Sequence, residues 1–298
     1  ITEKSELVAL LKKAPLLPVA SDKGGGKAGM TPSKPLVVDS GASSVEQPEE
    51  RHLLLILGSS VAMGSGSSEH CLSWAGLLEE AVRPQGFEVE NRSVPGSTAK
   101  LWRYVLDELE YLDWSQLSRE VWQPTGRRGD ASLEDSVGPL DLALLRTKAP
   151  DSKILSRALV VVLSLSLGNE GLSRKTQPQE LHELEKEFIS SLWAVVKALR
   201  ARMIPWARLV LGGPYPHNEF GPQHAQVLNH VLQEMRSWDE VDLVVDFLDP
   251  SSGICSRKGF GRWQKGVCKD NAHPNDLGHK LMFSCLDPKK ILGEFWKA

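Results

Sequence analysis

From residue 52 onward, apolar runs of strand length alternate with helical patterns. The predicted strands cover 52–58, 87–93, 158–167, 207–213 and 241–247, and the predicted helices cover 72–82, 98–112, 176–200, 223–235 and 274–286. Strands that alternate with helices form βαβ units with right-handed crossovers and a parallel sheet. The sequence therefore predicts an α/β protein, a three-layer α/β/α sandwich around a parallel sheet of five strands.

Residues 1–50 have a different composition from the rest of the chain. They are rich in glycine, serine, proline and charged residues, as in "SDKGGGKAGMTPSKP". Such a segment cannot bury enough apolar surface to pack on its own. We predict an extended low-complexity tail at 1–50 and one folded domain at 51–298, and we expect the tail to be the place where a protein partner would bind.

Charge and hydropathy exclude two classes of partner. The formal net charge of -3 produces no field that would attract nucleic acid. No apolar run approaches the roughly 20 residues that a membrane-spanning helix needs, so we expect no membrane span. The sequence begins at Ile1 without methionine, which suggests a processed organellar or secreted protein more than a cytosolic one.

The four cysteines lack the spacing of a structural metal site. Cys71, Cys255, Cys268 and Cys285 contain no C-x-x-C pair, and free thiols are the simpler interpretation. A bridge between Cys255 and Cys268 would close a short basic loop if the compartment is oxidising. The sequence leaves these two alternatives open.

Polar residues follow each predicted strand. They are Gly58-Ser59-Ser60, "SVPGST" at 93–98, "LGNEG" at 167–171, "GGPYPH" at 212–217 and, after a long basic loop, "DNAHPN" at 270–275. Parallel α/β sheets bind ligands outside the carboxyl ends of their strands. One edge of the sheet should therefore collect a serine, a glycine turn, an asparagine, an aspartate and a histidine.

This ordered set resembles the SGNH hydrolases, also called the GDSL esterase/lipase superfamily, over residues 52–297. Ser60 matches the nucleophile of the first block, Gly96 and Asn169 match the second and third blocks, and Asp270 and His273 match the final Asp-x-x-His. The resemblance implies the SGNH hydrolase fold, with a flavodoxin-like sheet. Two positions depart from the pattern: Ser59 replaces the usual aspartate, and Leu167-Gly168-Asn169-Glu170 stands where Gly-x-Asn-Asp is typical.

The chemistry of these residues agrees with the resemblance. A serine hydroxyl becomes a good nucleophile when a general base removes its proton, and His273 is placed for that role. Asp270 would orient the imidazole. The backbone N–H groups of Ser60 and Gly96 and the side chain of Asn169 would form an oxyanion hole.

We therefore predict a serine esterase that hydrolyses a carboxylic ester, with a short-chain acyl or acetyl group, through an acyl-enzyme and without a metal or organic cofactor. The expected substrates are small esters or acylated carbohydrates or lipids. The alternative is an SGNH-fold accessory or scaffold subunit with little or no activity, anchored by its N-terminal tail. The altered first and third blocks favour this alternative, whereas the complete set of five site residues favours the enzyme.

Four further residues are candidates for lining the substrate site. Ser59 adjoins the nucleophile, and His217 lies at the end of the fourth predicted strand. Arg262 and Trp263 belong to the basic loop before Asp270, which could act as a lid or as a docking surface for an anionic or aromatic group. The remaining histidines in helical patterns, at 182, 224, 230 and 279, are expected to be exposed or half-buried.

Overall fold

The computed structural model describes residues 51–107 and 142–297, apart from residue 258. The predicted tail at 1–50 lies outside the described residues, so its structure and its partner stay predictions. The described helices include none that is both long enough and apolar enough to cross a membrane.

The centre of the fold is one parallel sheet. Its strands are β1 (His52–Gly58), β2 (Phe87–Asn91), β3 (Ala158–Ser164), β4 (Arg208–Gly212) and β5 (Leu243–Val245). They lie in the order β2-β1-β3-β4-β5, and every adjacent pair is parallel. This order is the flavodoxin-like one, and the predicted fold class is confirmed.

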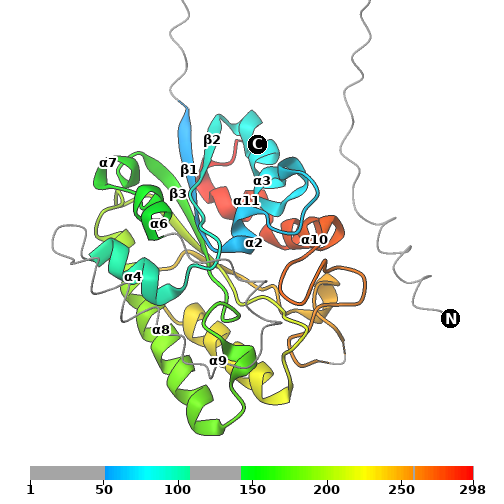
Figure 1. The fold of residues 1–298 in the computed structure, drawn as a ribbon. Helices are drawn as coiled ribbons and strands as arrows, with labels where there is room; N and C mark the ends of the chain where they lie inside the picture. Colours follow the sequence, from blue (N-terminus) through cyan, green and yellow to red (C-terminus); the bar gives the residue numbers. More distant parts are fainter. Residues whose placement is uncertain (1–50, 108–141, 258, 298) are drawn as a thin grey trace, which may run out of the picture. The chain divides into compact units, whose positions relative to one another are not determined.

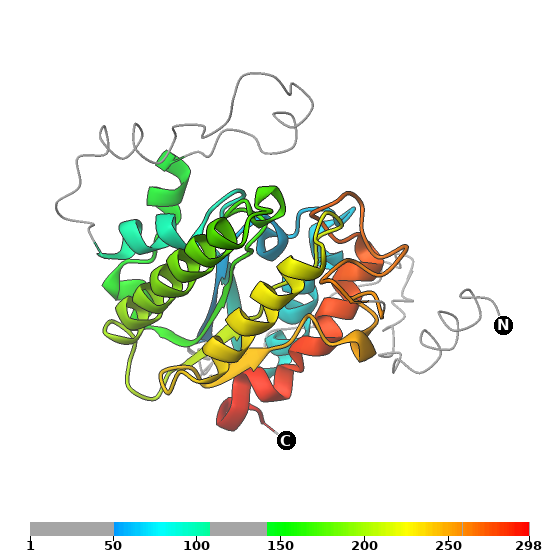
Figure 2. The same ribbon diagram turned by 90° about the horizontal axis from the view of Figure 1, so that it is seen from below.

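Helices cover both faces of the sheet (Figures 1 and 2). One layer contains α4 (Ala99–Asp107), α6 (Leu142–Lys148), α7 (Ser152–Leu155), α8 (Pro178–Arg200) and α9 (Pro222–Arg236), and the other contains α2 (Ser60–Met63), α3 (Trp74–Val82), α10 (Asp276–Leu286) and α11 (Pro288–Leu292). Short 3-10 helices occur at η1 (His70–Leu72), η2 (Arg83–Gln85), η3 (Leu172–Arg174), η4 (Pro250–Ser252) and η5 (Gly293–Phe295).

Strand β1 shows why the sequence forms two cores. Its side chains alternate between the faces of the sheet, as the period of two in a strand requires. Leu53, Leu55 and Leu57 enter the core on the side of α8, and Leu54 and Ile56 enter the core on the side of α3. All five are essentially inaccessible to solvent, which explains the continuous apolar run in the sequence.

Strand β5 is shorter than predicted, and an aspartate lies next to each of its ends. Asp242 precedes the strand and accepts the backbone N–H of Leu209 through its carboxylate, at 2.7 Å. The same carboxylate pairs with Arg200. After the strand, Asp246 accepts the N–H groups of Leu248 and Asp249 and turns the chain away. Helices α2, α6, α7 and α11 were not predicted, since four to seven residues are too few to show a helical period.

His224 is buried, contrary to the prediction from the sequence. It lies in the first turn of α9, where its Nδ1 accepts the N–H of Gly221 at 2.8 Å. Its Nε2 then carries the proton and donates to the backbone oxygen of Lys175 at 2.7 Å. The ring therefore joins the start of α9 to the segment that precedes α8.

Gly58 ends β1 at a point where the backbone of β3 comes very close. A Cβ at this position would lie 2.2 Å from the carbonyl oxygen of Ser164 and 2.6 Å from the Cβ of Ala62. Only glycine fits between the two strands here. This close approach sets the position of the next two residues, Ser59 and Ser60.

We expect Gly58→Ala to lower the free energy of unfolding by about 1–3 kcal/mol, because the backbone of β3 must move to admit the methyl group. Gly221→Ala is the matched control, because a Cβ there would meet only the flexible side chain of Gln223. Its cost should stay below about 1 kcal/mol. Urea denaturation of both variants measures the difference, and equal losses would contradict this account of Gly58.

Candidate active site

Ser60 lies where β1 ends and α2 begins. It is the first residue of the helix, so its backbone N–H is one of the N–H groups that have no partner within the helix. Ser60 is only 9% exposed, and its Oγ lies 3.0 Å from Nε2 of His273. The two residues are 213 positions apart in the chain, and the fold brings them into hydrogen-bond contact.

His273 is oriented by Asp270. Its Nδ1 lies 2.9 Å from Oδ2 and 3.1 Å from Oδ1 of the carboxylate. The carboxylate accepts, so Nδ1 carries the proton and Nε2 is free to accept from the Ser60 hydroxyl. Partial burial acts to raise the pKa of Asp270, but bonds from the His273 ring and from the N–H groups of His273 and Ala272 outweigh it and hold the pKa below its usual value.

The loop that carries Asp270 and His273 is fastened at Asn271. The backbone oxygen of Asn271 accepts the N–H of Asn218 at 2.9 Å and the indole N–H of Trp263 at 3.2 Å. Trp263 is only 4% exposed and belongs to the core beneath the loop. Arg262 is exposed, and its guanidinium donates to the backbone oxygen of Phe220.

These contacts change the expected roles of two residues in the basic loop. Trp263 supports the loop from inside, so its buried ring cannot face a substrate. Arg262 joins the basic loop to the segment after β4, although its exposed surface still leaves room for a ligand. Both side chains therefore connect the basic loop to neighbouring backbone.

A second set of bonds fixes the chain after Ser60. Nε2 of His279 donates to the backbone oxygen of Ser65 at 3.1 Å, while its Nδ1 accepts the N–H of Trp74 at 3.4 Å. His279 is buried, contrary to the prediction, and burial lowers its pKa and keeps it neutral. The carboxylate of Asp276 also accepts the backbone N–H and the hydroxyl of Ser68, at 2.7 and 2.8 Å.

Ser97 connects the loops that carry Ser60, Gly96 and Asn169. Its hydroxyl donates to the backbone oxygen of Gly58 at 3.0 Å, and its own backbone oxygen accepts Nδ2 of Asn169 at 3.0 Å. The second N–H of Asn169 has no partner among the described residues. Gly96 has φ 73°, a left-handed conformation that favours glycine. The three candidate donors thus lie on loops that hydrogen bonds hold together.

Ser59, the residue before Ser60, forms a buried hydrogen bond with Tyr215. The two hydroxyl oxygens are 2.9 Å apart, and Ser59 has no exposed surface. Burial raises the pKa of Tyr215 to about 12, so the phenol stays neutral. Ser59 was expected to line the substrate site, but its burial excludes direct contact with a substrate. A neutral pair therefore occupies the position where the SGNH pattern has an aspartate.

His217 is a partly buried, neutral histidine whose ring lies near the loop of Asn169. Its Nδ1 accepts the N–H of Glu219 at 3.2 Å, which leaves the proton on Nε2. Its Cδ2 would lie 3.6 Å from a Cβ placed on Gly168, the residue before Asn169. Burial lowers the pKa of His217, so the ring is neutral at pH 7, and both Asp270 and His273 act on it electrostatically.

The described residues contain no group of three or more histidine, cysteine, aspartate or glutamate side chains that could hold a metal ion. All four cysteines are free thiols, Cys255 and Cys268 included. Burial raises the pKa of Cys255 and of Cys285 to about 11, so neither thiol is activated.

The family model for GDSL-like lipase/acylhydrolase matches residues 54–286. The chain belongs to this family. The match covers every residue of the candidate site, from Ser60 to His273. No curated protein matches the sequence significantly.

Solved structures similar to this one include TesA, the esterase EstA and the acyltransferase SsfX3. TesA has 17% sequence identity and a TM-score of 0.49, over 82% of this chain and 100% of its own. The psychrotrophic esterase EstA from Pseudoalteromonas sp. has 19% identity and a TM-score of 0.44, over 79% and 94%. The salicylyl-acyltransferase SsfX3 from a tetracycline biosynthetic pathway has 14% identity and a TM-score of 0.44, over 80% and 54%.

Three supporting residues were missed by reasoning from the sequence: Ser97, Tyr215 and Asn218. Each lies within or next to a strand-end segment that the sequence analysis singled out, so position was the available signal. Their partners are far away in the chain, at separations of 72 residues for Ser97 with Asn169 and 156 for Tyr215 with Ser59. A single sequence carries no direct sign of such pairs.

We expect Tyr215→Phe to lower the free energy of unfolding by about 1–3 kcal/mol, because the Ser59 hydroxyl is left buried without its partner. Ser59→Ala should cost less, and the double variant should cost less than the sum of the two single changes. Chemical denaturation of the three variants completes this cycle. Strictly additive losses would show that the two hydroxyls do not interact.

Proposed function

We propose that the protein is a serine esterase that hydrolyses a carboxylic ester with a short acyl group through an acyl-enzyme intermediate. The observation that carries this proposal is the continuous contact from Ser60 Oγ to His273 Nε2 at 3.0 Å and from His273 Nδ1 to Asp270 at 2.9 Å. A serine, a base and an orienting carboxylate in hydrogen-bond contact are the arrangement that nucleophilic catalysis requires.

In the acylation step, Ser60 Oγ bonds to the ester carbonyl carbon while its proton passes to Nε2 of His273. The carbonyl oxygen becomes an oxyanion, which the N–H groups of Ser60 and Gly96 and the free N–H of Asn169 would bind. His273 then gives the proton to the departing alcohol oxygen as the bond to carbon breaks. The acyl group remains on Ser60.

Water completes the cycle in a second addition and elimination. His273 removes a proton from the water as its oxygen bonds to the acyl carbon, and the same donors bind the new oxyanion. The bond to Ser60 Oγ breaks, the proton returns to Ser60, and the acid leaves. Asp270 keeps the imidazole in the tautomer that both steps need and stabilises its charged form.

We expect a fluorophosphonate probe to label the purified protein stoichiometrically, and we expect Ser60→Ala and His273→Ala to abolish labelling. Ser190→Ala and His182→Ala are the matched controls, since both residues are exposed and neither belongs to the site. The same variants are then assayed on p-nitrophenyl esters of increasing chain length. Removal of the nucleophile or the base should lower kcat by on the order of 10⁴-fold or more.

A folded protein that the probe does not label would overturn the esterase proposal. That outcome would favour the scaffold alternative. The next experiment would then be a search for a protein that binds residues 1–50.

We also propose that His217 lines the substrate pocket and donates from Nε2 to an oxygen of the substrate. This N–H has no partner among the described residues, and the ring is close to Gly168 in the loop of Asn169. A neutral imidazole can recognise an acceptor oxygen without attracting ions. An acylated carbohydrate offers such oxygens beside its ester.

His217→Phe keeps a flat ring against Phe220 and removes the donor. We expect it to raise KM for an acetylated sugar about tenfold while kcat changes little, because one hydrogen bond is lost in the bound state. Hydrolysis of p-nitrophenyl acetate, which lacks the neighbouring oxygens, serves as the comparison. An equal effect on both substrates would argue against direct contact.

A further inference from the structure

Glu170 directly follows Asn169, and its carboxylate reaches back to the loop of Gly96. Its Oε1 accepts the backbone N–H of Ala99 at 2.6 Å, at the first residue of α4. Glu170 as a residue is half-buried, but its carboxyl group is surrounded by protein. This is an interior carboxyl group that the chemistry of ester cleavage does not use.

Two bonds between the same pair of loops hold Asn169 in place. One runs from Nδ2 of Asn169 to the backbone oxygen of Ser97, and the other runs from the N–H of Ala99 to Glu170. In the first bond the loop of Asn169 donates, and in the second bond the loop of Asn169 accepts. The bonded residues are adjacent in that loop, at 169 and 170, and two positions apart in the other loop, at 97 and 99. Weakening the second bond would leave the Asn169–Ser97 bond as the remaining one of these two, while the backbone N–H of Asn169 stays bonded to Ser166 within its own loop.

The strength of the second bond depends on charge. A carboxylate accepts a backbone N–H roughly twice as strongly as a neutral group does. The start of α4 also favours a negative charge, because the first N–H groups of a helix point outward there. Protonation of Glu170 would remove both advantages at once.

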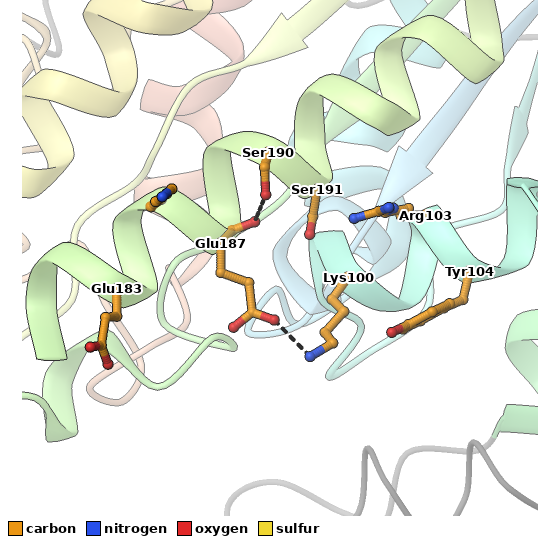
Figure 3. Close-up of a pocket in the computed structure, with 8 residues that line it drawn as sticks. Lys100, Arg103, Tyr104, Glu183, Glu187, Ser190 and Ser191 are labelled. Atoms are coloured by element: carbon orange, nitrogen blue, oxygen red, sulfur yellow. Dashed lines mark hydrogen bonds and ion pairs between the residues drawn. The ribbon is translucent and has the colours of Figure 1, made fainter.

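Two charged residues near Glu170 shift its pKa in opposite directions. Burial raises the pKa of Glu170 to about 7, the Ala99 N–H opposes this, Glu187 of α8 raises it further, and Lys100 of α4 lowers it. Lys100 and Glu187 form an ion pair of 2.6 Å across the groove between the two helices (Figure 3). Tyr104, on the same face of α4, acts on Lys100.

We propose that Glu170 is a positioning residue that holds Asn169 in the candidate oxyanion hole while its carboxylate is charged, and that the Lys100–Glu187 pair controls this charge. The inference rests on the proposed function of the site. It adds a dependence on protonation that lies outside the Ser60, His273 and Asp270 set.

The direction of the pH effect follows from the carboxyl group. Above about pH 7 Glu170 is charged, the loop is held by both bonds, and the oxyanion donor is in place. As the pH falls through this value, the bond to Ala99 weakens and the reaction at Ser60 slows. His273 must also be neutral to act as a base, so the wild-type protein should show two proton dependences on the acid side.

The test measures the rate of Ser60 phosphonylation by a fluorophosphonate between about pH 5.5 and 9, a range that extends to both sides of the pKa of Glu170, about 7. Glu187→Gln removes the charge that raises the pKa of Glu170, so the acid limb should move to lower pH. Lys100→Met removes the charge that lowers the pKa, so the limb should move to higher pH. Each shift should be on the order of 0.5 pH unit.

Glu170→Gln fixes the side chain in a neutral form. We expect it to remove one of the two proton dependences and to slow labelling at pH 8 about tenfold, part of the loss that removing an oxyanion donor causes. Glu183→Gln is the control, because Glu183 lines the same groove without acting on Glu170. The carboxyl carbon of Glu170, followed by ¹³C NMR in the full-length protein, should titrate in step with the labelling rate.

The outcomes separate this inference from the proposed function. A wild-type protein that is not labelled at any pH contradicts the esterase proposal, and the inference falls with it. If the protein is labelled but the acid side of its pH–rate profile does not shift in Glu187→Gln and Lys100→Met, the inference alone is overturned. The same holds if the profile shifts in the same direction in both variants. Opposite shifts, with no shift in Glu183→Gln, support it.

Discussion

The backbone oxygen of Gly58 is the point on which the candidate site depends. It accepts the N–H of Val94 at 2.9 Å and the hydroxyl of Ser97 at 3.0 Å, so the end of β1 and the loop after β2 are fixed to each other. Because no side chain stands between β1 and β3 at this position, Ser59 can donate its N–H to the backbone oxygen of Ser164. The turn that carries Ser60 is thereby bonded both to β3 and to the loop after β2.

Much of this arrangement could be predicted because the relevant signals are local. A buried parallel strand needs a continuous apolar run, and a catalytic residue at its carboxyl end must follow that run directly. Ser60 and Asn169 satisfy these conditions in the sequence, whereas the Asp270–His273 pair follows the last strand only after a long basic loop. The order of the blocks along the chain then indicated the family, and the family model and the sheet order agree with it.

The errors concern contacts between distant residues. His279 occurs in a helical pattern that is compatible with an exposed position, yet its ring is buried because it joins Ser65 to the start of α3. Trp263 belongs to a basic segment that suggests a lid, but its ring fills the core beneath Asn271. Whether such a side chain is buried depends on which loops pack together at the edge of the sheet. The local composition of the sequence does not show which loops these are.

The two departures from the SGNH pattern change the electrostatics of the site together. At the first block, an aspartate is replaced by the Ser59–Tyr215 pair, which stays neutral because burial raises the pKa of Tyr215 to about 12. At the third block, a glutamate replaces an aspartate, and its longer side chain reaches Ala99 at the start of α4. Relative to the SGNH pattern, a carboxyl group is absent at the position before Ser60, and a longer one follows Asn169. The neutral Ser59–Tyr215 pair keeps its charge state across the physiological pH range, whereas burial raises the pKa of Glu170 to about 7, so the carboxyl group beside the asparagine is the one of the two that can change charge there.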